Sequence, residues 1–121
     1  MDFEFDNNIP IYVQLVEQIK IYIISGKIKP GERVLSVRDL ALEFKVNPNT
    51  VQKALVELEN LKLIYTERTN GRFVTDDQNL IDIYKRKYAD ELSYKYFLSM
   101  KNIGYDMNEA IDYLKKLRGD K

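Results

Sequence analysis

The sequence predicts a mostly α-helical protein with one small β-hairpin. Two observations support this class. Apolar residues recur at helical spacing through most of the 121 residues. One pair of short β-type segments flanks Asn70-Gly71, a dipeptide that is favoured in hairpin turns. Because the hairpin follows two short helices joined by a tight turn, the predicted architecture is a winged helix-turn-helix followed by two C-terminal helices.

The composition excludes several classes of function. The chain has 19 basic and 19 acidic residues, no cysteine and no histidine. Disulfides, thiol catalysis, imidazole acid–base chemistry and most zinc sites are therefore excluded. No Walker loop or carboxylate cluster is present, and no apolar run approaches the ~20 residues that span a bilayer. We expect a cytoplasmic protein without enzymatic activity, metal, cofactor or membrane contact.

The predicted helices follow from apolar periodicity and capping residues. The first runs from about Ile11 to Ser25. Ser36-Val37-Arg38-Asp39 has the pattern of a capping box and begins a second helix of about nine residues. Asn47-Pro48 begins the third helix, because asparagine is a strong N-cap and proline is tolerated at the first helical position.

The chain changes character near Asp76-Asp77. Residues 63–67 and 72–75 form the two strands of the predicted hairpin, whereas residues 78–102 and a segment that starts at Asp106 are helical. Charge is close to balanced on both sides of the change, so a nucleic-acid surface must arise from local arrangement. We expect a DNA-binding domain over residues 1–76 and a helical dimerisation region over residues 77–121.

The third helix carries the sharpest functional pattern. No acidic residue occurs between Glu43 and Glu57. Asparagine and glutamine match the hydrogen-bonding edge of adenine, whereas threonine and lysine suit phosphates. A solvated polar face is the alternative, but the tight helix-turn-helix favours DNA binding. The outward-facing candidates are Asn47, Asn49, Thr50, Gln52 and Lys53.

Two further basic groups extend this candidate surface. Arg38 lies in the first turn of the second helix, where it can reach phosphate or a base, or can instead pair with Glu43 or Asp39. At the hairpin tip, the wing candidates for the DNA backbone or minor groove are Arg68, Asn70, Gly71 and Arg72. A solvated hairpin tip is the alternative for that group.

The C-terminal region carries an apolar stripe that recurs every four residues. Each step of four overshoots a helical turn by about 40°, so the stripe winds around the helix. Two helices of this length cannot bury it within one subunit, which predicts a homodimer. The expected interface residues are Leu80, Tyr84, Tyr88, Leu92, Tyr96, Ile111 and Leu114. An aromatic effector pocket at that interface is the alternative, although no small-molecule effector is specifically indicated.

Residues 9–75 resemble the N-terminal domain of the GntR family of bacterial transcription regulators. The resemblance rests on the order and spacing of Pro10-Ile11-Tyr12-Val13-Gln14-Leu15, Ile28-Lys29-Pro30-Gly31-Glu32-Arg33, Ser36-Val37-Arg38-Asp39-Leu40-Ala41, Val46-Asn47-Pro48-Asn49-Thr50-Val51 and Asn70-Gly71-Arg72-Phe73-Val74. The short helical tail resembles the YtrA-like subfamily. The resemblance implies a homodimeric repressor on a palindromic operator, with Ser36 joining Arg38, the third helix and the wing among the DNA contacts.

Three positions depart from the family pattern. Val34-Leu35-Ser36 stands where Leu-Pro-Ser is usual, and Thr69 stands near a usual glycine of the wing. Lys62 replaces a glycine that would end the third helix in a left-handed conformation, so we expect a differently built cap there. None of the three removes a candidate DNA contact.

The sequence thus favours a transcriptional regulator that binds an inverted-repeat operator in double-stranded DNA as a homodimer. The alternative is a winged-helix module that binds another protein and has no DNA specificity. That alternative makes the acid-free gap across the third helix a coincidence.

Overall fold

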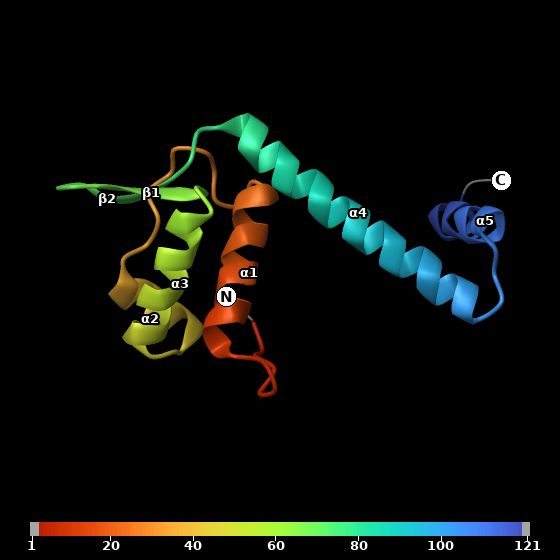
Figure 1. Ribbon diagram of the computed structural model, residues 1–121, viewed down its shortest axis with the longest axis horizontal. Helices are drawn as coiled ribbons and strands as arrows, with labels where there is room; N and C mark the ends of the chain where they lie inside the picture. The colour runs from red at the N-terminus through yellow and green to blue at the C-terminus, as the bar shows by residue number, and fades with distance from the viewer. Residues whose placement is uncertain (1–2, 120–121) are drawn as a thin grey trace. The chain divides into compact units, whose positions relative to one another are not determined.

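The computed structural model describes residues 3–119 and divides the chain into two compact units (Figure 1). The units are Met1–Ile83 and Tyr84–Lys121, and the division falls inside a long helix. In chain order the elements are α1 (Ile11–Ile24), α2 (Val37–Phe44), α3 (Pro48–Asn60), β1 (Ile64–Glu67), β2 (Gly71–Val74), α4 (Gln78–Asn102) and α5 (Met107–Arg118). The predicted fold class is confirmed.

The first unit packs its three short helices and its hairpin around one apolar core. α1 and α2 both pack against α3 (Figure 1). Most core residues come from α1, α2, α3 and the hairpin, and the largest fully buried side chains are Leu15, Ile19, Ile23, Val51, Leu55, Leu58, Leu63, Ile64 and Val74. Because these side chains face inward, the polar residues of α3 face solvent.

Side-chain caps fix where α2 and α3 begin. The Ser36 hydroxyl accepts a hydrogen bond from the Asp39 backbone N–H at 3.1 Å. Only this half of the predicted capping box forms among the described residues. No return hydrogen bond joins the Asp39 carboxylate to the Ser36 backbone N–H. α2 ends at Lys45, whose φ of 56° is left-handed, and Asn47 caps α3 two residues later. This short connection is the predicted tight turn.

The hairpin gains a third extended segment that the sequence analysis did not predict. Gly31 N–H donates to the Val74 carbonyl at 3.0 Å, and Val34 N–H donates to the Arg72 carbonyl at 2.8 Å. The Val74 N–H donates in return to the Glu32 carbonyl at 2.9 Å. β2 is therefore flanked by β1 on one side and by residues 31–34 on the other.

Two details of the prediction around the hairpin are wrong. The chain turns through Arg68–Asn70 rather than through a two-residue Asn-Gly turn, and only Gly71 there has a positive φ, of 98°. Lys62 adopts a φ of 65°, so α3 does end in the left-handed conformation. The cap expected to be built differently is therefore the usual one, formed by a lysine in place of glycine.

The second unit contains the later part of α4 and the whole of α5. Ala110 is buried in this unit, and the Tyr96 hydroxyl donates a hydrogen bond to the Ala110 carbonyl at 2.7 Å. Asp106 and Glu109 form a complete capping box at the start of α5, as the sequence predicts for the cap. Within residues 3–119, no helix is long and apolar enough to cross a membrane.

Candidate nucleic-acid interface

The N-terminal half of α3 presents the predicted polar face to solvent. Asn49, Gln52 and Lys53 are exposed, whereas Thr50 is half-buried. The first turn of α3 contains no acidic residue, so the partial positive charge of the helix N-terminus is not neutralised by its own side chains. This arrangement attracts anions and leaves amide groups available for base edges.

Two candidates on α3 also make contacts within the domain. The Asn47 side-chain oxygen accepts from the Asn49 backbone N–H at 2.8 Å, which leaves the amide NH₂ of Asn47 free to donate outward. The Lys53 ammonium lies 4.0 Å from the centre of the Tyr12 ring on α1, at a distance typical of a cation–π contact. Lys53 is thus held on the side of α3 that faces α1.

At the start of α2, Ser36 and Arg38 are both exposed. Since Ser36 uses an oxygen lone pair for the cap, its O–H remains able to donate to a phosphate. Arg38 forms no ion pair with any residue that the structure describes, so the pairing with Glu43 or Asp39 considered above is not present. Its guanidinium is therefore available to a partner.

The four wing candidates have different surroundings. Arg68 is exposed in the turn, whereas the Asn70 amide donates to the Glu67 carboxylate at 3.3 Å. Arg72 forms an ion pair with Glu59 of α3, with Nε and Oε1 3.0 Å apart. A Cβ atom added to Gly71 would lie 3.2 Å from the Arg33 guanidinium. Arg68 is thus the wing cation with the freest head group, and Arg72 is engaged within the domain.

Glu59 joins α3 to both strands of the wing. Its carboxylate accepts hydrogen bonds from the Thr66 hydroxyl on β1 and from Arg72 Nε on β2. The Thr66 hydrogen bond, followed by the hydrogen bond and charge of Arg72, holds the pKa of Glu59 below its ordinary value against the opposing effect of partial burial. The carboxylate is therefore ionised at neutral pH.

A small groove brings two of the predicted clusters together. Its volume is about 160 Å³, and it is lined by the segment that leads into α2 and by the wing, through Arg33, Val34, Leu35, Ser36, Val37, Gly71 and Arg72. Ser36 and Gly71 at the start of β2 thus border one concave surface, although they are 35 positions apart in the sequence.

Arg33 and Glu59 are two residues near the wing that the sequence did not indicate. The Arg33 guanidinium lies against Gly71, and nothing near it in the sequence indicates that neighbour. Glu59 follows the buried Leu58 at the end of α3, where an acidic residue is ordinary on an exposed surface. Only the pairing of the strands in space reveals that both side chains reach the wing.

The second unit carries the candidate dimer surface. Tyr84, Tyr88 and Tyr96 are half-buried, as is Leu80 at the start of α4 in the first unit. Leu92, Ile111 and Leu114 are exposed. Other exposed apolar side chains of this unit are Tyr94, Leu98, Ile103, Met107, Tyr113 and Leu117. So much exposed apolar surface in one small unit is typical of an interaction surface.

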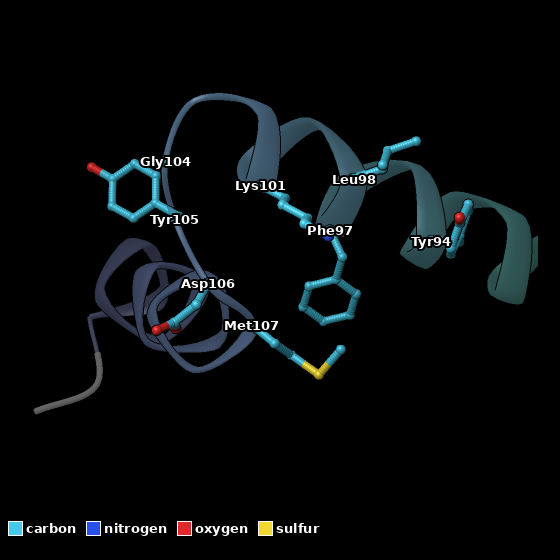
Figure 2. Close-up of a pocket in the computed structure, with 8 residues that line it drawn as sticks. All are labelled: Tyr94, Phe97, Leu98, Lys101, Gly104, Tyr105, Asp106 and Met107. Atoms are coloured by element: carbon cyan, nitrogen blue, oxygen red, sulfur yellow. The ribbon is translucent and has the colours of Figure 1, made fainter.

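The same unit contains a groove of about 590 Å³ between the end of α4 and the start of α5. Figure 2 shows Phe97 from α4 and Met107 from α5 on its walls, with Tyr94 and Leu98 further along α4. Lys101 and Asp106 are the charged residues that line it. The Asp106 carboxylate accepts the hydrogen bond that caps α5. Most of the other residues that line the groove are apolar or aromatic.

The sequence profile described as "Bacterial regulatory proteins, gntR family" matches residues 11–74, which include all of α1 to β2. The chain belongs to the GntR family. The match covers the exposed face of α3, the start of α2 and the wing, and it confirms the family resemblance drawn from the sequence motifs. The family's regulators are DNA-binding helix-turn-helix proteins, so the chain is a DNA-binding transcriptional regulator and not an enzyme.

Full-length relatives extend the similarity beyond the winged domain. The uncharacterized HTH-type transcriptional regulator YhcF of Bacillus subtilis is 33% identical over 115 residues, which are 95% of each chain. The HTH-type transcriptional repressor YtrA of the same organism is 30% identical over 92% of this chain and 86% of YtrA. These matches include both C-terminal helices and support membership of the short YtrA-like subfamily.

Solved structures show the same arrangement. A GntR family transcriptional regulator from Listeria monocytogenes superposes with a TM-score of 0.84 at 37% identity, covering 93% of this chain and 98% of that one. The DNA-binding domain of AraR in complex with operator ORR3 superposes with a TM-score of 0.53 at 32% identity. That match covers 62% of this chain and 88% of the AraR domain, which is bound to its operator in that structure.

Proposed function

We propose that this GntR regulator is a cytoplasmic repressor that binds an inverted-repeat operator as a homodimer. The observation that carries the proposal is the exposed, acid-free polar face at the N-terminal half of α3. In a helix-turn-helix protein the second helix of the motif enters the major groove with its N-terminal residues toward the bases. The residues exposed on α3 are those that such a docking needs.

The side chains divide into two kinds of contact. Asn49 and Gln52 have a paired donor and acceptor, and Arg38 has forked donors, which are the groups that read base edges. Ser36, Thr50 and Lys53 suit phosphate oxygens. The wing residues Arg68, Asn70 and Gly71 suit the backbone or the minor groove, as do the terminal nitrogens of Arg72, since only its Nε contacts Glu59. Because phosphate contacts dominate affinity, binding is expected to weaken steeply with salt.

The exposed apolar surface of the second unit supports the homodimer. Two copies of the chain present two recognition helices, which reach successive major-groove faces about 34 Å apart along the duplex. Repression is supported by the YtrA relative, which is a transcriptional repressor. The groove near Phe97 is mainly apolar, so association of two chains explains it without a small-molecule effector.

The proposal is tested by selecting bound fragments from genomic DNA and titrating the full chain against the resulting duplex. We expect tight, salt-sensitive binding to one inverted repeat and much weaker binding to a scrambled duplex. Arg38→Ala should weaken specific binding by at least ~1 kcal/mol, roughly fivefold, because it removes a base or phosphate contact.

Lys29→Ala is the matched control, since Lys29 is also an exposed cation of the first unit but lies in the turn after α1. It should leave specific binding nearly unchanged. An identical isotherm for Arg38→Ala and the wild type would refute the role of Arg38. Equal affinity for all duplexes, or none, would refute sequence-specific regulation and would favour the protein-interaction alternative.

A further inference from the structure

The position of Glu59 suggests a role that neither the sequence motifs nor the fold assign to it. Glu59 lies in the last turn of α3, and its Oε1 atom accepts from both Thr66 and Arg72. Thr66 and Arg72 are direct cross-strand partners in the hairpin. One carboxylate oxygen therefore binds a facing pair, with one member from each strand of the wing.

This pair sits where the apolar anchorage of the wing ends. Side chains alternate between the two faces of a strand, so Thr66 and Arg72 share a face with the preceding pair, Ile64 and Val74. Ile64 and Val74 are buried in the core, whereas Thr66 is exposed. Beyond the buried pair, Glu59 is the residue of α3 that holds the outer half of the hairpin.

An isolated two-stranded hairpin is marginally stable in water, so the outer half of the wing needs an anchor to keep a fixed direction. The pairing of residues 31–34 with β2 holds one edge of the wing. The Glu59 contacts hold both strands from the side of α3. Because α3 carries the base-reading face at its other end, this carboxylate links the position of the wing to the recognition helix itself.

We propose that Glu59 is a positioning residue for DNA binding, which orients the wing relative to the recognition helix through Thr66 and Arg72. The inference rests on the proposed DNA-binding function, to which it adds a residue that touches no DNA. A carboxylate near DNA ordinarily opposes binding through its charge. If Glu59 instead supports binding by orienting the wing, its removal should lower the operator affinity, which is the opposite of the effect of charge alone.

The first arm of the test measures operator affinity of the full chain for Glu59→Ala and for Glu57→Ala. Both variants lose one negative charge from α3, but the Glu57 side chain has no hydrogen bond or ion pair to any described residue. Charge alone predicts equal or tighter binding for both. Orientation of the wing predicts that Glu59→Ala binds more weakly, by roughly fivefold, the equivalent of one ordinary hydrogen bond, while Glu57→Ala does not.

The second arm measures backbone amide exchange without DNA. In Glu59→Ala and in Thr66→Val, which removes the hydroxyl donor but keeps the shape, the amides of residues 66–73 should exchange several-fold faster. The amides of Leu55 and Leu58, which report on the α3 core, should be unchanged. If Glu59→Ala does not fold, Glu59→Gln can be compared with the wild type instead, because it removes the charge from the contact with Arg72.

The outcomes separate the two proposals. Faster exchange in the wing together with weaker operator binding supports the role of Glu59. Unchanged exchange overturns it whatever the affinity, and faster exchange with unchanged affinity overturns the link to DNA binding. If the wild-type chain binds no duplex specifically, the proposed function fails, and with it the role in DNA binding, while the exchange arm still decides whether Glu59 holds the wing.

Discussion

At the residue scale, one carboxyl group makes the anchorage of the wing sensitive to acid. The pKa of Glu59 is lowered in the folded chain by the Thr66 hydrogen bond and then by Arg72. Its contribution to stability is therefore complete above the pKa of an unfolded glutamate and is lost as the pH falls through the folded pKa. The charged form is the one that the fold favours.

We therefore expect Glu59→Gln to destabilise the chain at pH 7 and to have a smaller effect at pH 3. At pH 7 the loss should be about 0.5–1 kcal/mol, because the carboxylate is about a third exposed and solvent screens the ion pair. Denaturant unfolding of both proteins at the two pH values measures the difference. A deficit that persists undiminished at low pH would contradict the assigned role of the charge.

Lys62 is a second residue whose backbone is informative. Its φ of 65° is in the left-handed region, which disfavours a residue with a Cβ atom by roughly 1–2 kcal/mol. Glycine avoids this strain but loses more conformational entropy on folding, about 0.5–1 kcal/mol. The two effects oppose each other, and the first is larger.

Lys62→Gly should therefore raise the free energy of unfolding by about 0.5 kcal/mol, whereas Lys62→Ala should give no such gain. Alanine is the matched control because it removes the same side chain and keeps the Cβ atom. Denaturant midpoints of the three proteins provide the comparison. A midpoint for the glycine variant at or below that of the alanine variant would rule out relief of backbone strain.

At the scale of elements, the helices were predictable because their signals are local. α3 begins where Asn47 and Pro48 predict, since an N-cap and a first-turn proline act on the same few residues. The exposed face of α3 was predictable for the same reason, because burial of every third or fourth residue fixes which side chains remain outside. The cap of α5 at Asp106 also follows this rule.

Features that depend on contacts between distant segments were not predictable. The extended segment of residues 31–34 has only four residues and no alternating pattern, and it is held by bonds to β2 about 40 residues further along. The Arg72 side chain was predicted as a wing contact, and its ion pair with Glu59 exists only because α3 and the hairpin meet. The turn at the wing tip differs from the prediction because register, set by the buried Ile64–Val74 pair, overrides the local Asn-Gly preference.

At the scale of the whole molecule, the two units differ in how much apolar surface they bury. The first unit contains a buried apolar core, although some of its apolar side chains, such as Leu42 and Val56, are also exposed. The second unit leaves a large part of its apolar side chains in solvent, with Leu92 65% exposed and Leu117 73% exposed. A single chain gains little by folding such a unit, and the proposed second chain would stabilise it by covering the apolar surface.

The homodimer is tested by placing a charge on the exposed face of α5. Leu114→Glu should shift the chain from dimer to monomer at micromolar concentration and should weaken binding to the full inverted repeat far more than binding to a half-site. Because Leu114 is already half exposed within one chain, the substitution should alter the folding of an isolated chain by only about 0.5 kcal/mol. A large change in mass therefore reports on a partner chain.

Sedimentation equilibrium measures the mass, and Lys115→Glu is the control, because it adds negative charge at the neighbouring exposed position of α5. A wild-type chain that sediments as a monomer, or a Leu114→Glu chain that remains dimeric, would show that this face of α5 does not join two subunits.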